Sequence, residues 1–154
     1  MKRLNRRTLF ALAGACVSLG FGSGLAGTAQ AASAAVEVAR SPTCQCCEAW
    51  IGHMRAEGFE VRERLVEDLT PLKMQLGVPA ALQSCHTAVV DGYVIEGHVP
   101  PKEVRRLLEE KPSGIGLAVP GMPMGSPGME TAGTLDTYEV LLFGAEHSTV
   151  FARY

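Results

Sequence analysis

The stretch of the sequence that most restricts the fold is the pair Asp91-Gly92, which lies between two runs rich in β-branched residues. These runs are "HTAVV" (86–90) and "YVIEGHV" (93–99). An Asp-Gly pair flanked in this way is the strongest short signal for a two-residue hairpin turn, because both residues of such a turn readily adopt a positive φ. The sequence therefore predicts an antiparallel hairpin centred on residue 91.

The turn also predicts the register of the two strands. With a two-residue turn Val90 pairs with Tyr93, and counting back pairs Cys85 with His98. Directly opposed residues share a face of the sheet, with Cβ atoms about 5 Å apart. We therefore expect Cys85 and His98 to converge at the open end of the hairpin, and His86 to point to the opposite face.

The apolar patterns around the hairpin predict the other elements. Alternation predicts strands at 36–40 and 59–66, and three-four spacing predicts a helix after residue 44 that ends at Gly58. Further helices are predicted at 68–77 and 101–110. The order is βαβα, then a hairpin, then α. This is a thioredoxin-like α/β arrangement, whose reactive site lies at the first strand-to-helix turn.

Three cysteines lie within four positions at that turn. They are Cys44, Cys46 and Cys47 in "SPTCQCCEAW" (41–50). Cys44 and Cys47 have CxxC spacing, and the start of a helix stabilises a thiolate. Three thiols at one turn exceed what one redox pair needs.

The N-terminus predicts the compartment. Residues 1–10, "MKRLNRRTLF", are basic, an apolar run follows, and "AQA" at 29–31 provides small residues before a cleavage site. This is the layout of an export signal to the periplasm, and Arg6-Arg7 resembles a twin-arginine signal. A membrane anchor is the alternative, but the apolar run is short and interrupted by glycine. Cys16 would leave with the signal.

Removal of residues 1–31 leaves a chain of 123 residues. This chain is mildly acidic, because the removed segment contains four of the 14 basic residues and no acidic residue, so the formal charge changes from −2 to −6. That length suits one domain. We divide it into a thioredoxin-like metal-binding part (34–111) and a Met/Pro/Gly-rich loop with a C-terminal hairpin (112–154). The lack of a basic stripe argues against nucleic-acid binding, and we expect no membrane span after signal removal.

Three motifs together resemble one family. "CQCCEAW", "VPAALQSCHTAVVDGYVIEGHVP" and "GLAVPGMPMGSPGME" are similar to the CopG-like family of periplasmic copper-resistance proteins, long catalogued as a domain of unknown function. The resemblance spans 36–154. It implies a thioredoxin-like fold that binds copper as a thiolate-bridged Cu(I) cluster. By position, its ligands would be Cys44, Cys46, Cys47 and Cys85.

The chemistry of sulfur supports copper but leaves alternatives open. Soft thiolate ligands select Cu(I). Tetrahedral zinc usually draws on two CxxC knuckles, and this chain has one; an iron–sulfur cluster is a weaker alternative. Four cysteines in an oxidising compartment would by default form two disulfides, but adjacent Cys46 and Cys47 rarely bridge each other.

A thiol-disulfide oxidoreductase using Cys44 and Cys47 is the second functional class. Thioredoxin-like oxidoreductases place a proline before the hairpin, whereas this chain has "QSCHT" there. The thiols of Cys46 and Cys85 would also interfere with a two-electron couple. We expect the protein to bind copper ions rather than catalyse, with other periplasmic copper-handling proteins as possible partners.

The histidines and the tail add weaker candidates. His98 is the histidine we expect as a ligand, whereas His53 lies about 10 Å along its helix from Cys46 and His147 lies in a turn. The pattern fits two roles for His86 equally well: a core or capping residue, or a residue that supports the metal ligands without binding the metal. Residues 112–133 are rich in Pro and Gly and predict a loop. Its Met122 and Met124 either fill the core or form a lid that supplies Cu(I) ligands.

Overall fold

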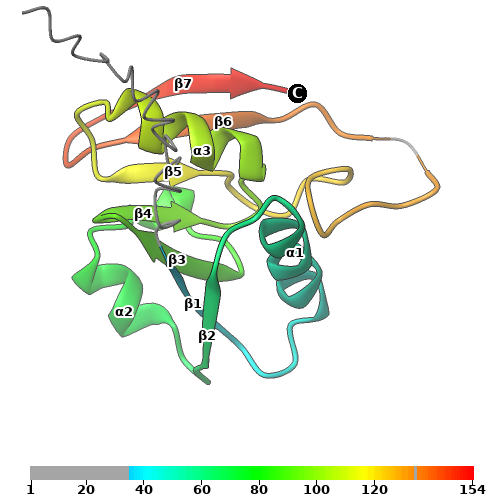
Figure 1. The fold of residues 1–154 in the computed structure, drawn as a ribbon. Helices are drawn as coiled ribbons and strands as arrows, with labels where there is room; N and C mark the ends of the chain where they lie inside the picture. The colour runs from blue at the N-terminus through cyan, green and yellow to red at the C-terminus, as the bar shows by residue number, and fades with distance from the viewer. Residues whose placement is uncertain (1–34, 134) are drawn as a thin grey trace, which may run out of the picture. The chain divides into compact units, whose positions relative to one another are not determined.

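The computed structural model describes residues 35–133 and 135–154. The predicted export signal (1–31) and the first residue of the predicted domain lie outside the described residues. Within them, seven strands form one sheet in the order β2-β1-β3-β4-β5-β6-β7 (Figure 1). The strands are β1 (Val36–Arg40), β2 (Val61–Leu65), β3 (His86–Val90), β4 (Tyr93–Glu96), β5 (Gly116–Ala118), β6 (Glu139–Phe143) and β7 (Ser148–Arg153).

Three α-helices and a short 3₁₀ turn connect these strands. They are α1 (Gln45–Ala56), α2 (Thr70–Gln75), the 3₁₀ turn Ala80–Leu82, and α3 (Pro101–Glu110). The element order up to α3 is βαβαββα, so the predicted α/β class and order are confirmed; the thioredoxin-like assignment stays a prediction. Among the described residues, no helix combines the length and the apolar character that crossing a membrane requires.

The predicted hairpin is present with the predicted register. Val90 pairs with Tyr93 and Thr87 pairs with Glu96. Both turn residues have a positive φ, 48° at Asp91 and 83° at Gly92. The C-terminal hairpin of β6 and β7 is also present. Local turn chemistry was therefore sufficient to define the hairpin of β3 and β4.

Residues 112–133 form no helix, as predicted, but they are not all loop, because they include β5. This short strand pairs parallel with β4 and antiparallel with β6. Gly116 permits the pairing: a Cβ there would lie 1.8 Å from the carbonyl oxygen of Val94. The glycine content that signals a loop here allows two backbones to approach closely.

The main core lies between the sheet and helices α1 and α3. Trp50, Ile51 and Met54 of α1 are fully buried, as is Leu107 of α3. The indole Nε1–H of Trp50 donates to the carbonyl of Val99 at 2.8 Å. Full burial of an Ile, Leu or Met side chain contributes about 1.5–3 kcal/mol to the free energy of folding. This packing holds the first turn of α1 against the end of the sheet.

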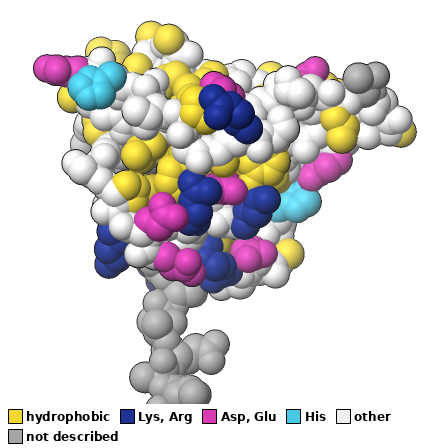
Figure 2. All heavy atoms as spheres, turned by 90° about the horizontal axis from the view of Figure 1, so that it is seen from above, with side chains coloured by type: hydrophobic (Ala, Val, Ile, Leu, Met, Phe, Trp, Pro, Cys, Tyr) yellow, Lys and Arg dark blue, Asp and Glu magenta, His cyan; other side chains and the backbone are white. Residues whose placement is uncertain are grey.

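Charged side chains of both signs lie on the surface. On the face in Figure 2, Lys and Arg side chains lie among Asp and Glu side chains. On α3, Arg106 pairs with Glu103 at 3.0 Å and with Glu110 at 3.4 Å. Glu103 is buried, whereas Glu110 is exposed; an exposed pair such as Arg106–Glu110 contributes little to stability.

Candidate metal centre

Four cysteine sulfurs meet at one end of the sheet. The Sγ atoms of Cys44, Cys46, Cys47 and Cys85 all lie within 4.8 Å of one another. The pairing of β1 with β3 explains the convergence, because it sets Arg40 opposite His86. The segment that leaves β1 and the residue that precedes β3 therefore lie side by side.

The first three cysteines occupy the start of α1. Cys44 is the N-cap residue, and Cys47 is completely buried. Cys44 and Cys47 form a disulfide, and the Sγ atom of Cys46 lies 3.5 Å from that of Cys44. Of the described cysteines, Cys46 and Cys85 are free. A disulfide sulfur carries no thiolate charge, so binding a metal through all four sulfurs requires the bond to be reduced by two electrons.

The Cys85 thiol is protonated at neutral pH in this metal-free state. Burial, followed by the neighbouring Cys46, raises the pKa of Cys85 to about 12. Because the thiolate is the form that binds metal, a metal must displace this proton. Metal binding through the Cys85 thiolate is therefore expected to weaken as the pH falls.

His98 directs one ring nitrogen at Cys85, as the hairpin register predicts. Its Nε2 lies 3.0 Å from the Cys85 Sγ, and its Nδ1 lies 2.8 Å from the carbonyl oxygen of Pro127. A carbonyl only accepts, so Nδ1 carries the hydrogen and Nε2 keeps its lone pair toward the cysteine. Burial lowers the pKa of His98 and favours the neutral ring. Metal-binding histidines are typically fixed in this way.

The prediction that His86 points away from the site is wrong. Its Nδ1 lies 3.3 Å from the Cys85 Sγ, and its ring centroid lies 5.1 Å from that of His98. Strand alternation does not extend this far, because β3 begins at His86 and β4 ends at Glu96. Gly97 follows with a φ of 71° and turns the chain. The glycine directly before His98 was the sequence signal for this break.

His86 is held deep in the core. It is fully buried, its ring packs 4.5 Å from that of Trp50, and its Nε2 has no hydrogen-bond partner. Burial, with added repulsion from His98 and Lys73, lowers the pKa of His86 well below its usual range. The neutral ring therefore forms, with Cys85 and His98, a second group of converging ligand atoms.

The loop that follows β5 packs against the start of α1. Gly128 has a φ of 89°, and a Cβ there would lie 2.6 Å from the carbonyl oxygen of Cys46. Glu130 accepts a hydrogen bond from the backbone of Gly128 and contacts His53 Nε2 at 2.7 Å. The loop backbone therefore reaches the cysteines. Met122 is 51% exposed and Met124 is half-buried, and their role as lid ligands stays a prediction.

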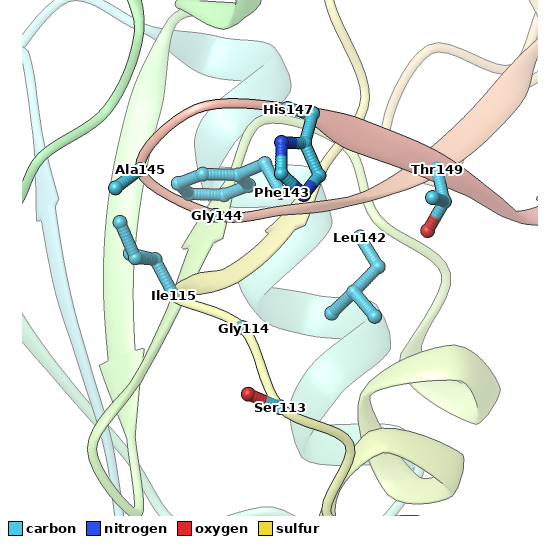
Figure 3. Close-up of a pocket in the computed structure, with 9 residues that line it drawn as sticks. All are labelled: Ser113, Gly114, Ile115, Leu142, Phe143, Gly144, Ala145, His147 and Thr149. Atoms are coloured by element: carbon cyan, nitrogen blue, oxygen red, sulfur yellow. The ribbon is translucent and has the colours of Figure 1, made fainter.

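The other two histidines lie away from the cysteines, as expected. His53 is half-exposed and contacts Glu130. His147 lines a surface hollow of about 490 Å³ near the turn between β6 and β7, together with Ser113, Phe143 and Thr149 (Figure 3). None of the four clustered cysteines lines this hollow.

Comparisons with known proteins identify the family. Residues 82–129 match the family described as a protein of unknown function, DUF411. The solved structure of form 1 of copper resistance protein CopG is 43% identical, with a TM-score of 0.74 over 78% of this chain and 96% of the solved chain. Form 2 is 41% identical, with the same TM-score over 79% and 98%. No similar sequence was found among curated proteins. The chain therefore belongs to the CopG family of copper resistance proteins.

Proposed function

We propose that the chain is a periplasmic protein that binds Cu(I) through the thiolates of Cys44, Cys46, Cys47 and Cys85 and serves copper resistance or handling. The observation that carries this proposal is the convergence of four cysteine sulfurs within 4.8 Å. Thiolate is the ligand type that selects Cu(I). The names of the two solved relatives, copper resistance proteins, agree with copper as the metal.

The density of sulfur favours more than one copper ion. Adjacent Cys46 and Cys47 lie on one helical turn, and Cys85 approaches them from the segment just before β3. A bridging thiolate neutralises part of the charge of two cuprous ions at once, so a small group of thiolates can hold several ions. We infer a thiolate-bridged cluster in the reduced protein.

His98 is the nitrogen ligand that we propose for this centre. Its lone pair already faces Cys85, and its other nitrogen is held by the loop carbonyl of Pro127. Met122 and Met124 belong to the same loop and complete the proposed ligand set as thioethers. A loop that both orients the histidine and supplies methionine would couple copper binding to loop closure.

A thiol-disulfide oxidoreductase is the second candidate, and the Cys44–Cys47 disulfide favours it. In that reaction two thiols of a partner would be oxidised to a disulfide. Cys44 and Cys47 would be reduced to two thiols and take up the two protons. Cys46 and Cys85 would have no part in this exchange, which makes the two candidates separable.

The proposal predicts an exported, copper-loaded protein. When the full chain is produced in copper-supplemented cells, we expect the periplasmic fraction to contain protein that begins near Ala32 and holds copper in excess of zinc. N-terminal sequencing and metal analysis measure both. Uncleaved protein in the cytoplasm, or zinc as the main metal, would contradict it. The variant Arg6→Lys/Arg7→Lys keeps the positive charge and shows whether export uses the twin-arginine route.

A further inference from the structure

A buried ion pair lies directly behind the candidate metal centre. Glu96, the last residue of β4, is fully buried, and Lys73 of α2 is 5% exposed. The Lys73 ammonium donates to Glu96 Oε1 and, at 2.8 Å, to the Thr87 hydroxyl. The Thr87 hydroxyl donates in turn to Glu96 Oε2 at 2.7 Å. Every charge in this group is therefore paired.

The same carboxylate also holds the backbone next to Cys85. Glu96 Oε1 accepts a hydrogen bond from the backbone N–H of Ser84 at 2.6 Å. Ser84 precedes Cys85, and Glu96 lies two residues before His98. One side chain thus connects the segment that carries the cysteine to the strand that leads to the histidine.

Two further contacts tighten this junction. A Cβ on Gly97 would lie 2.6 Å from the Cβ of Ser84 and 2.7 Å from the carbonyl oxygen of Val119. The hydroxyl of Ser84 donates to the carbonyl of Gly121, where the loop begins. The segments that carry Cys85, His98 and the loop are therefore packed together at Ser84.

Stability alone gives a weak reason for such a pair. Removing two charges from water costs about as much as their attraction returns, and apolar replacements of buried pairs are often neutral or stabilising. A buried charge is better explained by what its hydrogen bonds hold in place. An apolar residue could accept neither the hydrogen bond from the Thr87 hydroxyl nor the one from the N–H of Ser84, and only the second reaches the segment that carries Cys85.

We propose that Glu96, neutralised by Lys73, is a positioning residue of the copper centre. Its bond to Ser84 holds Cys85 opposite His98 and close to the cysteines of α1 before copper binds. The inference rests on the proposed function, because it assigns Cys85 as a copper ligand. It assigns a role at the copper centre to Glu96, whose side chain faces α2 on the other side of the sheet and not the sulfurs.

Two double variants test the hydrogen bonds that the side chain of residue 96 accepts, of which the one from Ser84 reaches the segment of Cys85. Lys73→Met/Glu96→Gln and Lys73→Met/Glu96→Met both remove the ion pair and have side chains of similar shape, but only Gln keeps an acceptor for Ser84. We expect the Gln variant to bind Cu(I) like the wild type. The Met variant should lose on the order of 10–100-fold in affinity, as when a group that orients a ligand is removed. Competition with a Cu(I) chelator measures this, and alkylation of Cys85 in the metal-free protein should be faster in the Met variant.

Glu103→Gln is the matched control. Glu103 is also buried and paired, with Arg106 at 3.0 Å and the Tyr154 hydroxyl at 2.7 Å, but it lies on α3. We expect a lower melting temperature and unchanged Cu(I) affinity. Equal affinities in the two double variants, or a loss in the Gln variant as large as in the Met variant, would overturn the positioning role. If the Met variant does not fold, the Gln variant decides alone: Cu(I) affinity like that of the wild type supports the positioning role, and a loss on the order of 10–100-fold overturns it. Absence of copper binding in the wild type would instead overturn the proposed function, and Cys85 alkylation would still test the positioning.

Discussion

Replacement of Cys46 with serine is expected to lower the number of Cu(I) ions held per chain, even though the CxxC pair Cys44 and Cys47 remains. Cys46 is free, and its sulfur lies 3.5 Å from that of Cys44 and within 4.8 Å of the other cysteine sulfurs of the group. Loss of a bridging thiolate removes bonds to more than one ion. The affinity loss should therefore exceed the ~10–100-fold typical of a residue that only supports a ligand.

The same variant separates the two candidate functions. A simple oxidoreductase needs only Cys44 and Cys47, so its disulfide-exchange rate would be unaffected by Cys46→Ser. Gln45→Ser is the control, because it changes an exposed side chain on the same helical turn and removes no sulfur. Wild-type copper stoichiometry in Cys46→Ser, together with wild-type exchange activity, would favour the oxidoreductase.

Replacement of His98 with alanine is the second large expected effect. His98 Nε2 faces Cys85 at 3.0 Å, and its Nδ1 anchors the loop at Pro127. The variant loses both contacts. We expect Cu(I) affinity to fall on the order of 10–100-fold, or further if the nitrogen binds copper directly. Chelator competition and the emission of the Cu(I) cluster report the change.

His53→Ala is the matched control for this experiment. His53 also contacts the loop, through Glu130, but its side chain is half-exposed and it is not among the groups of converging ligand atoms. It should leave copper affinity and emission unchanged. Equal affinity in the wild type and His98→Ala would show that the histidine is not part of the site. An equal loss in His98→Ala and His53→Ala would show that only the loop contact matters.

The parts of the site that rest on local rules were predictable from the sequence. Asp91-Gly92 specifies a turn type, and the turn specifies the register that sets Cys85 opposite His98. The CxxC spacing before an amphipathic helix placed the other three cysteines at its first turn. Each of these inferences uses residues close in sequence, where backbone geometry leaves few choices.

The parts that depend on tertiary packing were not predictable. Cys85 and His98 come to the same side as His86 because both lie outside the strands, where Gly97 ends the alternation, while the His86 ring packs on Trp50. β5 needed the close approach that Gly116 permits. The pair of Lys73 and Glu96 joins residues 23 positions apart. No short-range pattern reports such contacts.

Anaerobic titration of Cu(I) into the mature protein, against a competing chelator and with metal analysis, tests the central claim most directly. The protein is first reduced, because Cys44 and Cys47 form a disulfide in the structure. A disulfide cannot bind copper as two thiolates. The account predicts more than one tightly held copper ion per chain in the reduced protein, and fewer when the disulfide is kept. Reduced protein that retains no copper against the chelator would contradict it.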